Sequence, residues 1–84
     1  MTKGTVTHIH AQRGMVAVAV DGNDFTIIEL LGDDVEVGDV LSWTDSMPLG
    51  GGRVYSHAQR RWLDVFFQNH AVHPSQLRQQ LLYV

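Results

Sequence analysis

The segment Met15-Val16-Ala17-Val18-Ala19-Val20 is followed by Asp21-Gly22-Asn23-Asp24 and then by Phe25-Thr26-Ile27-Ile28-Glu29-Leu30. In the first segment valine alternates with methionine or alanine, which is the two-residue period of a β-strand. Asp-Gly and Asn tolerate positive φ angles, so the second segment is typical of a tight hairpin turn. Together the three segments predict an antiparallel hairpin with one valine-rich face and one face of smaller or unbranched side chains.

Further short segments with strand character lie on both sides of this hairpin. We expect strands at about 3–10, 14–20, 25–30, 39–44 and 62–68, with a further short strand possible at 53–57. Residues 45–52 contain a proline and three glycines and predict a flexible loop. Pro74, followed by Leu77, Leu81 and Val84 at helical spacing, predicts a helix at about 74–83 that docks on the strands. The chain is therefore expected to form one mainly all-β domain over residues 1–84, a small five-stranded β-barrel with a short C-terminal helix.

Composition narrows the classes of function. The 84 residues include no cysteine, which excludes disulfides and thiolate metal sites. No apolar run near the N-terminus suggests a signal peptide, and the longest one, Met15 to Val20, is too short to cross a bilayer, so we expect a cytoplasmic protein without a membrane partner. Residues 1–44 carry seven acidic and two basic side chains. Because such a surface repels phosphates, nucleic acid is a disfavoured partner.

The segment from Gly4 to Gly14, GTVTHIHAQRG, resembles the opening of a cold-shock domain, and Asp21-Gly22 and 37–40 resemble that family's hairpin and fourth-strand entry. The resemblance implies a barrel of the OB type. Cold-shock domains stack bases on outward aromatic rings of their second and third strands. In this sequence the matching positions of the second and third strands are Met15, Ala17, Thr26 and Ile28, none of which is aromatic. The matching position of the first strand is His8, which keeps a flat ring. The whole chain also resembles a set of short uncharacterised bacterial proteins that share R-G-M-V-A-V, E-L-L-G-D and G-D elements.

This pattern leads to two interpretations of different classes. If the small apolar side chains of strands two and three face outward, we expect them to be covered by the C-terminal helix, through Leu77 and Leu81, or by a partner. The leading interpretation is a non-catalytic OB-like binding module, without a cofactor, that binds a protein or itself through Met15, Ala17, Thr26 and Ile28. The alternative is a degenerate cold-shock-type binder of single-stranded nucleic acid that uses His8, Arg53, Arg60 and Arg61.

The five histidines suggest a third possibility, a metal site. Neutral imidazole is a common ligand of zinc, copper and nickel. His8 and His10 share one face of a regular strand, and His70 and His73 stand three residues apart. A lesser alternative is therefore metal binding by these four residues.

Other combinations of residues carry less information about chemistry. Ser42, Ser56, His57 and Asp64 lack the sequence context of a known catalytic triad, so we do not expect an enzyme. Gly50-Gly51-Gly52-Arg53 lacks the helix start or Lys-Ser/Thr pair of a phosphate loop, although it could form one wall of a binding mouth. Four aromatic residues are interpreted as core: Trp43, Trp62, Phe66 and Phe67.

Overall fold

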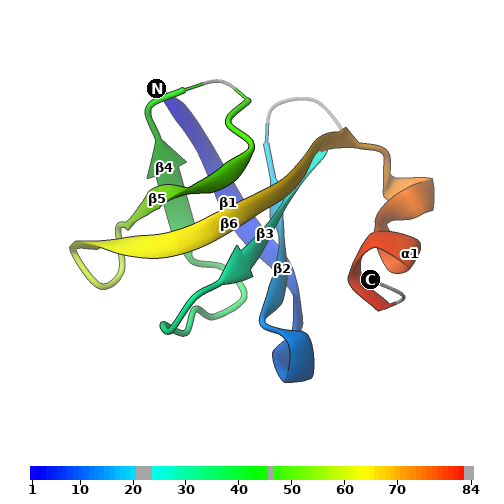
Figure 1. Cartoon of the computed structure of the whole chain (residues 1–84), viewed down its shortest axis with the longest axis horizontal. Helices are drawn as coiled ribbons and strands as arrows, with labels where there is room; N and C mark the ends of the chain where they lie inside the picture. The colour runs from blue at the N-terminus through cyan, green and yellow to red at the C-terminus, as the bar shows by residue number, and fades with distance from the viewer. Residues whose placement is uncertain (21–23, 46, 83–84) are drawn as a thin grey trace.

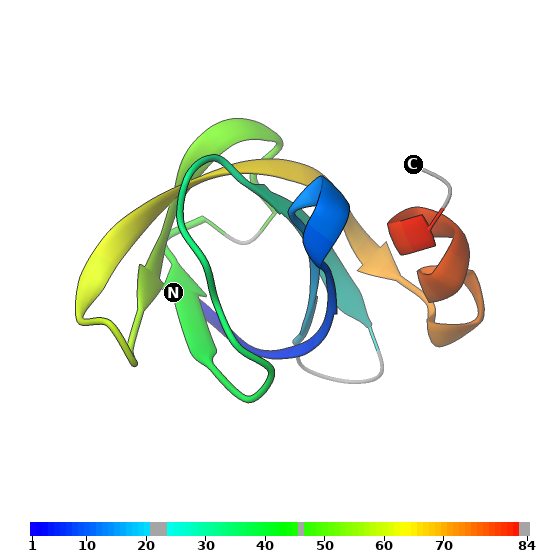
Figure 2. The ribbon, with the colours of Figure 1, turned by 90° about the horizontal axis from the view of Figure 1, so that it is seen from below.

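A computed structural model describes residues 1–20, 24–45 and 47–82 of the chain. The described residues form six antiparallel strands that close into a barrel in the order β1-β2-β3-β6-β5-β4, and a short helix follows them (Figures 1 and 2). The strands are β1 (Thr2–His10), β2 (Met15–Ala19), β3 (Phe25–Leu30), β4 (Val40–Trp43), β5 (Gly50–Ser56) and β6 (Arg61–Val72). A 3-10 turn, η1 (Ala11–Arg13), joins β1 to β2, and a second, η2 (Pro74–Gln76), leads into α1 (Leu77–Leu82). The predicted small β-barrel with a C-terminal helix is confirmed, with six strands rather than five.

The interior of the barrel is filled by alternate residues of all six strands. Val16 and Val18 of the opening hairpin point inward, as their alternation predicts, and the rings of Trp43 and Phe67 pack at a centroid distance of 5.7 Å. The described members of this cluster are Val6, Val16, Val18, Ile28, Val35, Leu41, Trp43, Val54, Leu63, Val65 and Phe67. Burial of this cluster is the main favourable contribution to folding.

The prediction of a loop through residue 52 is wrong, because the three glycines begin a strand. Gly50, Gly51 and Gly52 pair with Phe67, Phe66 and Val65 of β6. A Cβ atom at Gly52 would lie 2.9 Å from Cε2 of Phe67, so the Phe67 ring occupies the space that a side chain would need. Phe67, whose ring makes a glycine necessary at position 52, lies fifteen residues further along the chain.

A second apolar cluster lies outside the barrel, where α1 covers the outer face of β2 and β3. Leu77 and Leu81 of the helix pack there with Met15, Ala17, Ile27 and Val72, and Phe25 lies at the edge. The expectation that the C-terminal helix covers this face through its two leucines agrees with this packing. Figure 1 shows α1 at the side of the barrel, beyond the end of β6.

The predicted face of β3 is wrong by one residue. Ala17 of β2 is paired with Ile27, and Val16 is paired with Ile28. Because residues paired across two strands lie on the same face of the sheet, Ile27 joins Ala17 outside while Thr26 and Ile28 point into the barrel. The three consecutive residues Thr26-Ile27-Ile28 are all buried, and their composition alone does not reveal which face points inward.

Candidate functional site

The predicted partner-binding residues do not form a surface. Met15, Ala17, Thr26 and Ile28 are each at most 3% exposed. Met15 and Ala17 lie beneath α1, and Ile28 lies in the barrel core. Thr26 is held by a 3.0 Å hydrogen bond between its Oγ1 and Nδ1 of His70. As a contact surface this set is therefore wrong, because the chain itself covers all four residues.

The residues of the nucleic-acid alternative lie in separate environments. His8 on β1 makes an edge contact with Phe25 of β3, at a ring-centroid distance of 6.2 Å. Arg53 on β5 pairs with Asp64, and Arg61 at the start of β6 pairs with Asp33. Arg60 occupies the β5–β6 turn with a φ of 57°. The structure does not bring these four residues onto one face.

The predicted metal ligands are also dispersed. His8 and His10 are paired with Ala17 and Met15, so they share the outer face of β1 as expected. His70 contacts Thr26 and the carbonyl oxygen of Pro48, while His73 Nδ1 accepts a hydrogen bond from the backbone N–H of Ser75. Within residues 1–20, 24–45 and 47–82, the structure holds no group of three His, Cys, Asp or Glu side chains arranged to bind a metal ion.

The serine and histidine side chains near β4 make one close contact. Oγ of Ser42 lies 2.7 Å from Nε2 of His57, but Ser42 is only 2% exposed. The carboxylate of Asp64 pairs with Nε of Arg53 at 3.2 Å. Ser56 accepts a hydrogen bond from the backbone N–H of Gln59. The side chains considered for a triad therefore have other partners or are shielded from solvent.

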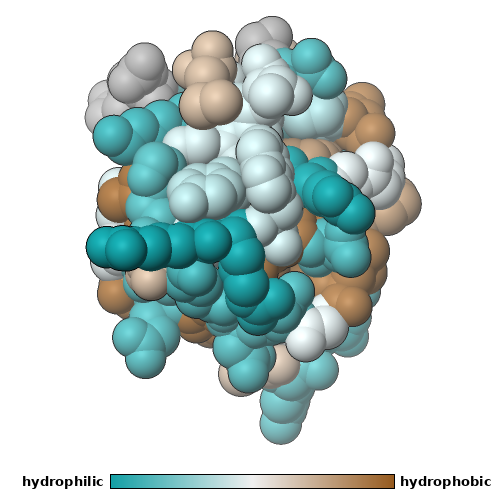
Figure 3. All heavy atoms as spheres, turned by 90° about the vertical axis from the view of Figure 1, so that its left-hand side faces the viewer, coloured by the Kyte–Doolittle hydropathy of each residue, from teal (hydrophilic) through white to brown (hydrophobic). Residues whose placement is uncertain are grey.

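Aromatic side chains gather instead on the outer surface of β5 and β6. Trp62 and Phe66 are 45% and 41% exposed, so their interpretation as core residues is wrong, whereas Trp43 and Phe67 are buried as expected. Tyr55 is paired with Trp62, and their rings meet at a centroid distance of 5.5 Å. We call this surface the aromatic face; its members are Arg53, Tyr55, Trp62 and Phe66. On the side of the barrel that carries the β5–β6 turn, the surface is largely hydrophilic, and hydrophobic atoms show mainly along its edges (Figure 3).

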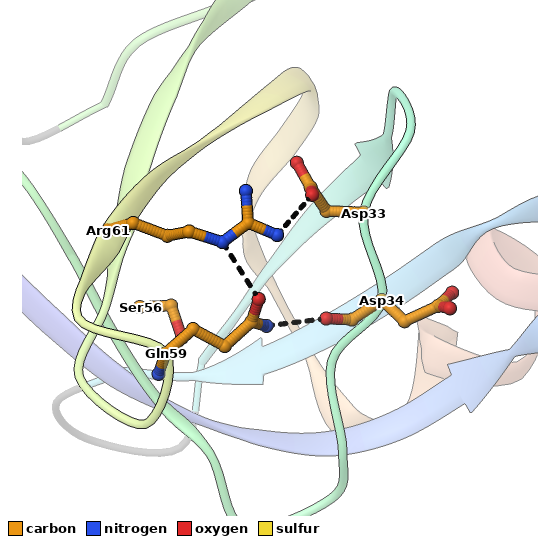
Figure 4. A network of polar contacts seen from close by, with 5 residues as sticks. All are labelled: Asp33, Asp34, Ser56, Gln59 and Arg61. Carbon is orange, nitrogen blue, oxygen red and sulfur yellow. Dashed lines mark hydrogen bonds and ion pairs between the residues drawn. The ribbon is translucent and has the colours of Figure 1, made fainter.

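A polar network holds the start of β6, at Arg61, in place beside the aromatic face. Nη2 of Arg61 lies 2.6 Å from Oδ1 of Asp33, and Nε of Arg61 donates to Oε1 of Gln59 (Figure 4). Gln59 in turn donates to the backbone carbonyl of Asp34. These contacts join the β5–β6 turn to the segment between β3 and β4. They therefore anchor the residue that precedes Trp62.

A pocket of about 350 Å³ adjoins the aromatic face, in the region between the end of β4 and the first half of β5. Arg53 and Trp62 line it together with buried rings of the core; the complete lining is Trp43, Thr44, Asp45, Pro48, Gly51, Gly52, Arg53, Trp62 and Phe67. Nε1 of Trp43 is buried and finds no hydrogen-bond partner among the described residues. The pocket therefore combines the exposed ring of Trp62 with the buried rings of Trp43 and Phe67.

The fold and the site define a small closed β-barrel with a helix packed on its outer side and an exposed aromatic face. Comparisons of the chain with protein-family models, with curated proteins and with solved structures found no match. Among the described residues, no helix has the length and apolar character needed to cross a membrane. Sequence reasoning missed the aromatic face, although one signal was present, since Trp62 and Phe66 alternate in phase with Asp64 and Gln68.

Proposed function

We propose that this chain is a non-catalytic, OB-like binding module that engages a protein, either a different partner or a second copy of itself, through its aromatic face. The observation that carries the proposal is the exposure of Trp62 and Phe66 on a molecule that already covers both of its apolar clusters. Neither ring is needed to fill the core. Tryptophan, tyrosine and arginine are the residues that most often contribute large binding energies at protein interfaces.

The arrangement of the aromatic face supports this role. Tyr55 lies between the rings of His57 and Trp62, at centroid distances of 5.2 and 5.5 Å. Strand pairing and these ring contacts restrict the side chains before a partner arrives, so less conformational entropy is lost on binding. Arg53 and Asp64 add an exposed ion pair, whose net contribution to stability is small. Both charges therefore remain available to a partner.

The experiment compares the wild type with a Trp62→Ala/Phe66→Ala double variant. Sedimentation equilibrium measures self-association, and quantitative cross-linking in cells measures which proteins lie against the chain. We expect at least one of these associations to weaken about 30-fold or more in the double variant, since a hot-spot side chain contributes about 2 kcal/mol or more. Val37→Ala, which changes a side chain that is 63% exposed on the β3–β4 connection, is the matched control. Associations that are the same in all three proteins would refute the proposal.

A second candidate function is the binding of single-stranded nucleic acid, because the exposed rings of Trp62 and Phe66 could also stack bases beside Arg53. The net charge of −3 and the ion pairs of Arg53 and Arg61 weigh against this candidate. Fluorescence anisotropy with labelled single-stranded DNA and RNA at low salt separates the two candidates. Saturable binding that falls steeply with salt and is lost in Trp62→Ala would favour nucleic acid over protein.

A further inference from the structure

The barrel wall is incompletely paired between β4 and β5. β5 is paired with β6 over its full length, from Gly50↔Phe67 to Ser56↔Arg61. On its other side only two residue pairs join it to β4, Leu41↔Ser56 and Ser42↔Tyr55. The stretch from Gly50 to Arg53 therefore has no neighbouring strand on that side among the described residues. In an antiparallel strand about half of the backbone N–H and C=O groups point to each side, so this edge offers both donors and acceptors.

The pocket beside Trp62 lies along this unpaired edge, since Gly51, Gly52 and Arg53 line it. Glycines carry no side chain that would crowd a segment lying against this part of β5. At Gly51 an added Cβ would meet no described atom within 4 Å. Trp43, at the end of β4, lines the same pocket.

We propose that this pocket accepts an extended peptide segment, which adds as a strand along Gly50–Arg53. The proposal rests on the proposed function, because the pocket opens beside Trp62 of the aromatic face. The backbone of the segment pairs with the edge of β5 that the described residues leave unpaired. An apolar side chain of the segment packs against the ring of Trp62. At about 3.3 Å per residue, the four residues Gly50–Arg53 match a segment of about four or five residues.

The charges of the pocket favour a peptide over a polyanion. Its described lining carries one cation, Arg53, and one carboxylate, Asp45. These charges offset one another, so the pocket lacks the excess of positive charge that a phosphodiester chain requires. The neutral backbone of an extended peptide, with alternating donors and acceptors, matches both the net charge and the hydrogen-bonding groups of the edge.

The test uses the full-length chain to select from a phage-displayed library of random heptapeptides. Selected peptides are then synthesised, and their affinities are measured by isothermal titration calorimetry. We expect the selected sequences to share an apolar residue. In NMR spectra of the complex, the indole N–H resonance of Trp43, assigned with a Trp62→Phe variant, should shift, because Trp43 lines the pocket. A peptide with alternate N-methylated backbone positions, which cannot complete a ladder, should bind at least tenfold more weakly.

Gly51→Val is the variant that tests the site. The backbone at Gly51 is not in the positive-φ region, and its Cβ position is open, so the variant is expected to fold. Gly51 is paired with Phe66, so the valine side chain would lie on the outer face beside the pocket. There it would crowd the peptide side chain that packs on Trp62 and reduce affinity at least tenfold, whereas Val37→Ala should leave affinity unchanged. Failure to select any peptide would overturn strand addition. It would also be overturned if the peptides bind Gly51→Val as tightly as the wild type and the N-methylated peptide binds as tightly as its unmodified form. Loss of partner binding in Trp62→Ala/Phe66→Ala but not in Gly51→Val would overturn this inference while supporting the proposed function.

Discussion

Truncation of Leu81 to alanine tests how α1 is held on the barrel. Leu77 and Leu81 are 7% and 5% exposed, and both pack in the outer apolar cluster. Leu81→Ala removes three carbon atoms, a transfer term of about 2.4 kcal/mol at about 0.8 kcal/mol for each methylene. Leucine truncations in closed cores cost about 2–5 kcal/mol. Because α1 lies at the end of the described chain and can adjust, we expect a loss of about 2 kcal/mol.

A double variant distinguishes a docked helix from an integral part of the fold. A helix of six residues is not stable alone, and fixing each backbone residue costs about 1–2 kcal/mol. We therefore expect α1 to leave the barrel once one leucine is truncated, so that the second truncation adds little. The loss in Leu77→Ala/Leu81→Ala should be clearly smaller than the sum of the two single losses.

Urea unfolding followed by tryptophan fluorescence measures these losses, since Trp43 and Trp62 both lie on the barrel. Undocking should also expose Met15, Ala17 and Ile27, which increases the binding of the dye ANS before the barrel unfolds. Leu49→Ala, at a side chain that is 71% exposed, is the control and should change stability by less than about 0.5 kcal/mol. Fully additive losses without increased dye binding would refute this account and would show that α1 unfolds together with the barrel.

Three further substitutions test other contacts. Gly4→Ala should destabilise the fold by about 1–3 kcal/mol, because the added Cβ would lie 2.6 Å from the carbonyl oxygen of Ala19. An unchanged midpoint of thermal unfolding would contradict the close approach of β1 and β2. His70→Ala should lower the free energy of unfolding in urea by about 1–3 kcal/mol, since it leaves the buried Thr26 hydroxyl without its 3.0 Å partner. A Thr26→Val/His70→Ala variant that recovers none of this loss would count against the explanation. A double-mutant cycle on Arg61 and Asp33 should give a coupling of about 0.2–1 kcal/mol that decreases with salt, and a coupling independent of salt would exclude a screened ion pair.

The barrel and its helical cover could be predicted because the relevant patterns are local. The alternation of Val16 and Val18 with alanines defines β2, and the leucine spacing defines the face of α1 that docks. The face of β3 could not be predicted in the same way. Ile27 and Ile28 are both apolar, and which of them points inward depends on the pairing Ala17↔Ile27, which the closure of the barrel sets.

The candidate site was harder to predict, because its features depend on contacts between distant residues. The exposure of Trp62 and Phe66 follows from their sharing a strand face with Asp64, and this alternation can be recognised in the sequence. The strand character of the glycines depends on pairing with Val65, Phe66 and Phe67, thirteen to seventeen residues later in the sequence. The short β4–β5 ladder depends on where β4 ends, and the sequence does not mark that point with a turn motif.

The three glycines of β5 differ in what the fold requires of them. Gly50 has a φ of 80°, which favours glycine, and Gly52 is restricted by the ring of Phe67. Neither reason applies to Gly51, whose Cβ position is open among the described atoms. Because glycine within a strand costs about 0.5–1 kcal/mol relative to alanine, the stability of the barrel alone would favour a side chain there.

A glycine that the fold does not need, beside a pocket, is explained if a bound segment packs over it. Gly51→Val is therefore expected to raise the free energy of unfolding by up to about 1 kcal/mol while it weakens peptide binding. Urea unfolding and calorimetry on the same protein preparation measure both effects. A destabilised variant would assign Gly51 to the fold rather than to the site, and the glycine would then no longer count as evidence for strand addition.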